Sequence, residues 1–304
     1  MMNILGNKKI FFAISLVLMI ASAASLIFQG FNLDTDFAGG MAVTYEIKDD
    51  FEVKDVEAVV SEALGANKKA SSVQKSENNE VIIKFGYDNN LTTDEERATF
   101  ASEKIEVIKT HLSKTYGEVE LKNKDIVSPS TGKELAKSAI WMSILAALAI
   151  LIYITFRFEF VSGACAVFAL FHDILILCGV YSITRIAIDT NFIAAILTVL
   201  GYSINATIVV FDRIRENTRH AKKQSYCEIA NASISQTLSR SINTTITTLL
   251  TIGMVYIMGV TSIKAFALPI IIGIIIGTYS SICIAGSVWA TWKDSAVKAK
   301  MNRK

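Results

Sequence analysis

The sequence predicts an α-helical membrane protein that has six transmembrane helices and one α+β domain between the first two. Three observations support this class. Apolar residues make up 52% of the 304 residues, and many of them gather in six long runs. An α-helix needs about 20 such residues to cross the hydrocarbon core of a bilayer. Between the first two runs lies a polar interval, residues 29–138, in which strand-like and helix-like patterns follow one another.

The six apolar runs are the predicted transmembrane helices. They are Ile10–Phe28, Ala139–Phe156, Phe160–Ile183, Phe192–Phe211, Ser241–Val260 and Ala265–Trp289. The first run follows Lys8 and Lys9 and contains Ala21-Ser-Ala23, which could be a signal-peptide cleavage site. Because the run continues past that site to Phe28, it is longer than a signal core of about 7–15 residues. We therefore expect a retained helix.

Lysine and arginine residues in the short segments set the predicted orientation, because positive charge collects on the cytoplasmic side. Basic residues are frequent before the first run, in segment 212–240 and in the tail 293–304, whereas the short outer loops hold only Arg185 and Lys264. We expect both termini in the cytoplasm, with residues 1–28 forming the N-terminus and first helix. Residues 139–292 would form the other five helices with a cytoplasmic loop at 212–240.

The interval 29–138 is predicted to fold outside the cytoplasm as a βαββαβ domain. Strands are expected at Met41–Ile47, Ser71–Lys75, Val81–Phe85 and Val119–Val127, and helices at Lys54–Leu64 and from Thr93 to about Tyr116. Glu77-Asn-Asn79 would be the turn between the second and third strands. Thr93-Asp-Glu-Glu96 is a capping box, which opens a helix. This order of elements is typical of a ferredoxin-like sandwich.

Composition and motifs exclude several classes of function. The net charge is +2, and no tract of lysine and arginine indicates a nucleic-acid surface. Neither a Walker A loop nor a G-x-G-x-x-G motif is present, so ATP-driven chemistry is not expected. The histidines and the cysteines Cys165, Cys178, Cys227 and Cys283 lack metal-site spacing. We expect no enzyme, no metal site and no cofactor.

The pair His172-Asp173 lies near the middle of the third predicted span. An aspartate at that depth must be paired, hydrated or protonated. The pair could relay a proton or another cation. It could also be a hydrogen-bonding strut between helices.

Polar faces mark the fourth and fifth predicted spans. In the fourth span one helical face holds Thr198, Tyr202, Asn205 and Val209, with Ser203 and Ala206 beside it. In the fifth span one side holds Arg240, Thr244, Thr247 and Thr251, next to Asn243. Such faces suit both helix packing and transport. Arg240 could extend to the cytoplasmic surface, or it could be a counter-charge near Asp173.

Three further patterns concern the last three spans. A charged cluster follows the fourth run without an intervening Gly or Pro and consists of Asp212, Arg213, Arg215, Glu216 and Asn217. Its simplest interpretation is a solvated loop that fixes the cytoplasmic end. Ser225-Tyr-Cys-Glu228 is a capping box that would open a helix leading into the fifth span. Gly273-x-x-x-Gly277 would allow close helix approach in the sixth.

Several motifs in combination resemble the SecD/SecF translocase subunits, which are similar to half-units of resistance-nodulation-division transporters. Asp36-Phe-Ala-Gly39-Gly40 resembles the D-F-x-G-G signature of that family. Further matches are Ile126–Leu135, Arg157-Phe-Glu159, His172-Asp173, Gly201–Asn205, Ile208–Asn217 and Thr237–Ser241. The short outer domain and the fourth span favour the SecF subunit over SecD.

The resemblance implies an accessory subunit of the Sec preprotein translocase in the bacterial cytoplasmic membrane. The implied partners are SecD, the SecYEG channel, exported preproteins and membrane lipids, and they include no nucleic acid. The subunit would use the membrane ion gradient, such as the proton motive force, to promote export. Asp36, Gly39 and Gly40 would form a hinge between the first span and the outer domain. Alternatively, the two glycines form a turn that starts the first strand.

One position departs from the family's pattern. Many SecF proteins carry an aspartate after the asparagine of the fourth span, and Ala206 stands there in this sequence. Alanine cannot exchange a proton, whereas Arg240 matches the family's arginine. Either an acidic group on SecD carries the coupling, or Asp173 substitutes, or the ion or the coupling itself differs. The candidate ion relay therefore consists of His172, Asp173, Asn205 and Arg240.

Two other functions fit part of the pattern. A resistance-nodulation-division-type exporter of small molecules or lipids usually carries two six-span halves and larger outer domains in one chain. A non-transporting assembly factor of the Sec machinery would need no ionisable group at position 206, so Ala206 favours that alternative.

Overall fold

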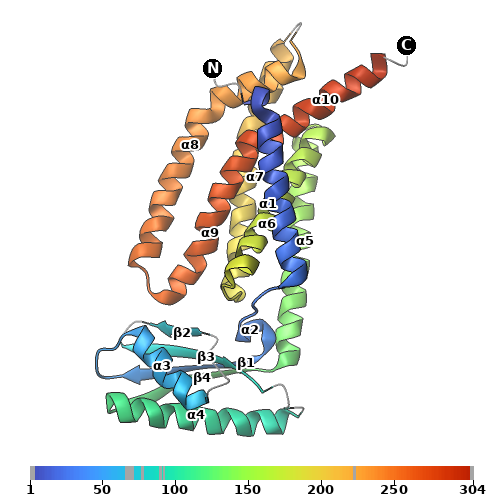
Figure 1. The fold of residues 1–304 in the computed structure, drawn as a ribbon. Coiled ribbons are helices and arrows are strands. Elements are labelled where there is room, and N and C mark those ends of the chain that lie inside the picture. Colours follow the sequence, from blue (N-terminus) through green and yellow to red (C-terminus); the bar gives the residue numbers. More distant parts are fainter. Residues whose placement is uncertain are drawn as a thin grey trace.

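The computed structural model describes residues 4–65, 72–76, 79–88, 91, 93–221 and 224–301. These residues form a bundle of long helices and a separate α+β domain at one end of it (Figure 1). Both chain termini lie at the opposite end of the bundle. We call that end the terminal end, and the end that carries the α+β domain the domain end.

Long apolar helices build the bundle. They are α1 (Lys8–Phe28, preceded by the 3-10 turn η1, Leu5–Asn7), α5 (Pro129–Arg157), α6 (Phe160–Thr184), α7 (Thr190–His220), α8 (Tyr226–Met258) and α9 (Thr261–Tyr279), which continues through the π-helical segment η2 (Ser280–Ala285) into α10 (Gly286–Met301). Within the described residues, six stretches are long and apolar enough to cross a membrane. They coincide with the six predicted spans.

The solvated loop predicted for the charges at 212–223 is wrong as far as His220, because α7 remains helical from Thr190 to His220; α8 then begins at Tyr226. No Gly or Pro interrupts α7 after Phe211, so its backbone hydrogen bonds continue through the charged cluster. The capping box at Ser225 is confirmed, and it starts α8 as predicted. The tail is also helical as far as Met301.

The second and sixth spans differ from their predicted form. Helix α5 begins at Pro129, where Ser128 caps it and proline occupies the first turn, and it runs from the α+β domain through the bundle (Figure 1). The sixth span is not one regular α-helix, because η2 interrupts it from Ser280. Single π-helical turns occur frequently at functional sites.

The α+β domain has the predicted βαββαβ order. After the short helix α2 (Thr35–Ala38) it contains β1 (Gly40–Ile47), α3 (Val53–Leu64), β2 (Ser72–Lys75), β3 (Glu80–Gly86), α4 (Asp94–Tyr116) and β4 (Val119–Val127). The strands form an antiparallel sheet in the order β2-β3-β1-β4. The capping box that opens α4 is confirmed. The predicted turn at Glu77-Asn-Asn79 lies mostly outside the described residues.

Alternation along β1 builds the core of this domain. Met41, Val43, Tyr45 and Ile47 are buried, because every second side chain of a strand points to the same face. Helices α3 and α4 cover that face, with α4 on the side away from the bundle (Figure 1). The buried Tyr45 hydroxyl donates to the Ile105 carbonyl at 2.7 Å. The domain therefore has a hydrophobic core that is separate from the bundle.

Candidate functional site

The D-F-x-G-G motif packs directly against the start of α5 at the domain end. Gly39 has a φ of +82°, and a Cβ atom there would lie 2.8 Å from Pro129 Cα. A Cβ atom on Gly132 would lie 2.5 Å from the Phe37 carbonyl oxygen. Only glycine permits such close approaches. Strand β1 begins at Gly40, which agrees with the alternative that the two glycines form a turn.

An ionic junction joins the same motif to the sheet and to α7. Lys84 on β3 donates to Asp34 at 2.7 Å and lies 3.6 Å from Asp36. Asp36 in turn accepts hydrogen bonds from the Thr190 backbone N–H at 3.1 Å and the Thr190 hydroxyl at 3.0 Å. Burial acts to lower the pKa of Lys84, but the hydrogen bond to Asp34 and the carboxylates of Asp36 and Asp189 outweigh it and raise the pKa. The exit of α1, the sheet and the start of α7 therefore share one charged contact.

A buried polar cluster lies inside the bundle around the predicted pair. His172 and Asp173 on α6 are 0% and 1% exposed. The His172 Nδ1 atom lies 2.9 Å from Asp173 Oδ1. Asp173 Oδ2 accepts hydrogen bonds from Ser203 on α7 at 2.6 Å and from Ser280, the first residue of η2, at 2.8 Å. One carboxylate thus connects three elements of the bundle.

A chain of hydrogen bonds continues from this pair to α1. The His172 Nε2 atom lies 3.1 Å from Ser15 Oγ. The Ser15 hydroxyl donates to the Tyr279 hydroxyl at 3.2 Å, and the Tyr279 hydroxyl donates to the Phe11 carbonyl at 2.9 Å. The pair is therefore hydrogen-bonded on both sides.

The directions of these hydrogen bonds assign the protons of the pair. Each hydroxyl has one proton to donate, so Tyr279 gives its proton to a carbonyl and Ser15 gives its own to Tyr279. Ser15 must then accept from His172, which places a proton on Nε2. Without another proton, the lone pair of His172 Nδ1 would face an Asp173 oxygen at 2.9 Å. A proton between these two atoms would make the contact a hydrogen bond, and the pair would then be neutral as a whole.

Small residues on α9 bring η2 close to this cluster. A Cβ atom on Gly277 would lie 3.0 Å from Ser203 Cβ and 3.5 Å from Asp173 Oδ2. A Cβ atom on Gly273 would lie 2.3 Å from Val199. The predicted close approach at these glycines is confirmed, and it places Ser280 within hydrogen-bond distance of the carboxylate.

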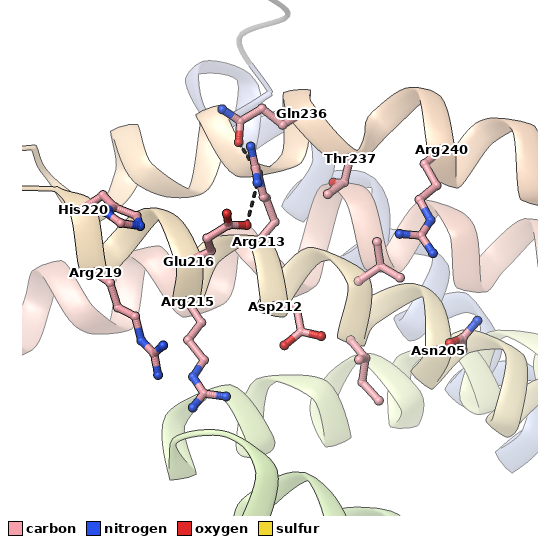
Figure 2. Close-up of a pocket in the computed structure, with 12 residues that line it drawn as sticks. Asn205, Asp212, Arg213, Arg215, Glu216, Arg219, His220, Gln236, Thr237 and Arg240 are labelled. Atoms are coloured by element: carbon pink, nitrogen blue, oxygen red, sulfur yellow. Dashed lines mark hydrogen bonds and ion pairs between the residues drawn. The ribbon is translucent and has the colours of Figure 1, made fainter.

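Asn205 and Arg240 occupy a different place, a groove between α7 and α8 (Figure 2). The groove has a volume of about 910 Å³. Figure 2 shows Arg240 reaching from α8 toward α7, where Asn205 lies. A smaller cavity of about 100 Å³ is lined by Asn205, Ala206 and Arg240. Asp212 and Arg215 are exposed and line the wide part of the groove.

The predicted relay residues therefore form two groups that lie at different faces of α7. One group is the His172–Asp173 pair, and the other is Asn205 with Arg240 in the groove. Successive residues of an α-helix turn by about 100°, so Ser203 faces Asp173 while Asn205 and Ala206 face the groove. The hydrogen-bond partners that the structure gives Asp173 are His172, Ser203 and Ser280. The alternative that Arg240 is a counter-charge near Asp173 is not supported by this arrangement.

The charged cluster at the end of α7 holds α7 and α8 together. Arg213 Nε donates to Gln236 at 2.6 Å, and its Nη1 pairs with Glu216 at 2.5 Å (Figure 2). Asn217 donates to Ser233 at 2.8 Å. These side chains connect α7 to α8, a contact that was not predicted from the sequence.

Several residues of both sites were not predicted from the sequence. Ser15 and Ser280 are isolated serines in apolar runs, and only their polarity in a membrane span could have drawn attention to them. Asp34 and Lys84 belong to segments that meet only in the folded chain. Within the described ranges, no group of three His, Cys, Asp or Glu side chains is placed to hold a metal ion.

The chain matches one protein family over most of its membrane part. Residues 107–295 match the family described as "Protein export membrane protein SecD/SecF, C-terminal". The protein translocase subunit SecF of Sebaldella termitidis is 34% identical over 93% of this chain and 89% of its own length. The subunit SecDF of Bacillus subtilis is 33% identical over 96% of this chain and 38% of its own length.

Solved structures of SecDF proteins are similar to this chain as well. The crystal structure of SecDF from Thermus thermophilus, titled a translocon-associated membrane protein, has a TM-score of 0.77 and 33% identity over 96% of this chain. A super-membrane-facing form of SecDF has a TM-score of 0.74. The chain spans about two fifths of these SecDF chains, with 39% and 40% covered. With its matching membrane domain and its SecF relatives, the chain belongs to the SecD/SecF family of protein export membrane proteins.

Proposed function

We propose that the chain acts with a SecD partner as an accessory subunit of the Sec preprotein translocase and uses the membrane ion gradient to promote protein export. The SecF relatives support the role in the translocase. The SecDF relatives, whose name combines both subunits, support the partnership with SecD. The use of a gradient rests on one observation, the buried His172–Asp173 pair inside the bundle.

The coupling ion that the pair suits is a proton. The groups that surround Asp173 Oδ2 are hydroxyl donors from Ser203 and Ser280. A sodium ion would need several oxygen atoms that turn their lone pairs toward one point, as hard cations do. A histidine–carboxylate pair instead holds and releases a proton without ligands. Loss of the shared proton would leave a net negative charge in the bundle, which is costly there.

Helix α7 is the element that would carry this change to the outer domain. Its Ser203 contacts Asp173, and its first residue, Thr190, contacts Asp36 at the domain end. A shift of α7 after release of the proton would therefore act on the motif that also binds Lys84 of the sheet. We propose that Asp36, Gly39 and Gly40 form the hinge at which the domain moves. Proton binding would shift the populations of two arrangements.

The groove between α7 and α8 would receive the SecD partner. Asn205, Arg240 and Thr244 are exposed, although they lie on helices of spanning length and composition. Polar side chains on spanning helices face protein or water. The cavity at Ala206 and Arg240 has room for an acidic group that this chain does not supply. We propose that an acidic side chain of SecD lies beside Arg240.

The topology follows from the same proposal. We place the α+β domain outside the cytoplasm and both termini inside, in the bacterial cytoplasmic membrane, because basic residues gather near the terminal end. We assign the domain to the ferredoxin-like class, supported by its βαββαβ order and antiparallel sheet β2-β3-β1-β4. We propose contacts with SecYEG and exported preproteins, and no catalytic role.

The experiment is export by a strain in which the chromosomal copy of this chain can be depleted. Depletion should slow preprotein export, and the wild-type chain should restore it. The Asp173→Asn variant should assemble with SecD but lose the part of export that collapses when the proton gradient is dissipated. The matched control Asp294→Asn removes a carboxylate from α10 and should keep that part.

The same strain separates the rival functions. Normal export together with accumulation of a small-molecule substrate would favour an exporter and contradict the proposal. Export that is fully restored by Asp173→Asn would favour a non-transporting assembly factor. That alternative has one supporting observation, the alanine at position 206 in the groove.

A further inference from the structure

A second cavity at the terminal end carries chemistry that the export mechanism does not use. It lies where the ends of α5, α6 and α7 meet α8 and α10, and its volume is about 450 Å³. Among the described residues, its charged lining groups are Arg215, Arg219, Lys293 and Glu159. Lys293 pairs with Glu159. Three cationic groups and one carboxylate leave a net charge of plus two, so the cavity favours an anion.

The two arginines line both the groove and this cavity, and their side chains turn away from α8. Figure 2 shows the side chains of Arg215 and Arg219 turned away from Gln236 and toward the green ribbon of the α5–α6 junction. Guanidinium groups bind phosphate oxygens through their fork of N–H donors. Their spacing of one helical turn on α7 places both on the same side of the helix.

A buried donor in the cavity wall lacks a partner. Trp289 lines the cavity and is 3% exposed, and its indole Nε1 atom has no hydrogen-bond acceptor among the described residues. Buried N–H groups are nearly always paired in folded proteins. Less than 1 Å² of this atom is accessible, so an acceptor oxygen of a ligand would reach it only after the Trp289 ring turns toward the cavity.

One wall of the cavity is the end of a helix that is long and apolar enough to cross a membrane. Phe156, near the end of α5, lines the cavity and is 89% exposed. Exposed aromatic rings next to basic residues are typical of the boundary between headgroups and acyl chains. Basic pockets between transmembrane helices on the cytoplasmic side bind anionic headgroups.

We propose that this cavity binds one anionic phospholipid. The phosphodiester lies against Arg215 and Arg219, an oxygen of the headgroup or ester region accepts from the Trp289 indole, and an acyl chain runs along Phe156. The lipid fixes the junction of α5 and α6 to α7 at the end of the bundle opposite the outer domain. This inference does not depend on the proposed export function.

The test is retention of lipids by the purified full-length chain, measured by native mass spectrometry in neutral detergent. Phosphatidylglycerol and phosphatidylcholine with the same acyl chains are the probes. The wild-type chain should retain phosphatidylglycerol more strongly. Each arginine near an anionic lipid is worth about 1 kcal/mol, which is about fivefold in affinity. The Arg215→Gln/Arg219→Gln variant should therefore bind phosphatidylglycerol about 25-fold more weakly, since the two losses multiply.

Two further variants separate a built site from diffuse surface charge. The control Arg213→Gln/Arg240→Gln removes the same charge from the groove of Figure 2 and should change the affinity less than twofold, about the spread of such measurements. Arg215→Lys/Arg219→Lys keeps the charge and should recover most of the binding. Equal losses in both glutamine variants would overturn the proposal. So would unchanged lipid binding together with loss of a co-purified channel partner, because the cavity would then be a protein contact.

Discussion

Substitution of Asp173 by asparagine should separate stability from coupling. Asparagine has almost the same shape as aspartate, and its oxygen can accept from Ser203 and Ser280, which lie 2.6 and 2.8 Å from Asp173 Oδ2. Its amide N–H can donate to His172 Nδ1, while Nε2–H continues to donate to Ser15. The variant therefore reproduces the neutral, proton-loaded pair. Its free energy of unfolding should stay within about 1 kcal/mol of the wild type, because no buried group is left unpaired.

Alanine at the same position gives the contrast that sets the magnitude. Asp173→Ala leaves the buried Ser203 hydroxyl and one imidazole nitrogen without a partner, whereas Ser280 can still donate to the Gly277 carbonyl at 3.1 Å. Each buried polar group left unsatisfied costs about 1–3 kcal/mol, so the total loss should be at least about 2 kcal/mol. His172→Leu should cost about 1–3 kcal/mol, because Asp173 Oδ1 loses its hydrogen-bond partner while Oδ2 keeps Ser203 and Ser280. The measurement is unfolding of the purified chain in detergent, followed by near-ultraviolet circular dichroism.

Two results would contradict the interpretation of His172–Asp173 as a neutral pair that carries the coupling proton. If Asp173→Asn destabilises the chain as much as Asp173→Ala, the pair is not a neutral pair that shares a proton. If Asp173→Asn is stable and still supports gradient-dependent export, the pair is structural. A double-mutant cycle with His172→Leu and Asp173→Leu should show a coupling free energy above about 1 kcal/mol.

Three other substitutions test the groove and the junction. Ala206→Asp should place a carboxylate beside Arg240 in the cavity that both positions line. The gradient dependence of export should then change. If the export rate and its ion dependence stay the same, this position does not limit coupling. Lys84→Met should lower the free energy of unfolding by about 3–5 kcal/mol, because Asp34, at 2% exposure, would lose its counter-charge. The raised pKa of Lys84 means that its stabilisation is fully present at neutral pH and is lost only as the pH rises through that pKa; a pH titration of unfolding that shows the loss near pH 7 would contradict it. Gly39→Ala should destabilise the junction by more than about 1 kcal/mol, because its φ of +82° and the 2.8 Å approach of α5 both exclude a side chain. The control is Gly65→Ala, where φ is +97° and the surrounding space is open. It should show only the cost of the backbone conformation.

Local patterns in the sequence predicted most of the architecture. The six spans, the βαββαβ order and both capping boxes depend on residues that are close in sequence, so periodicity and composition reveal them. The same reasoning failed at 212–220, where charged residues suggested a loop. Charge is no obstacle to helix formation when the helix leaves the apolar region, and the Arg213–Glu216 pair is an i, i+3 contact that a helix allows.

The candidate sites were only partly accessible to this reasoning. The sequence drew attention to His172 and Asp173, because ionisable residues in a span are rare. It could not place Ser15, which lies 157 residues away from His172 along the chain and meets it only through packing of α1 on α6. Nor could it reveal η2, since a π-helical turn has no strong sequence signature. The Lys84 junction likewise depends on how the domain sits on the bundle.

The two faces of α7 give the alanine at position 206 a physical meaning. Ser203 contacts the buried pair on one face, and Ala206 lines the cavity with Arg240 on the other. Loss of a carboxylate from the groove face therefore leaves every contact of Asp173 in place. An acid supplied by a partner could enter the groove without passing the buried pair. Under the proposed function, this chain would keep one protonatable pair of its own and take the second acidic group from its partner. Helix α7, which is continuous from Thr190 to His220, would connect the two sites.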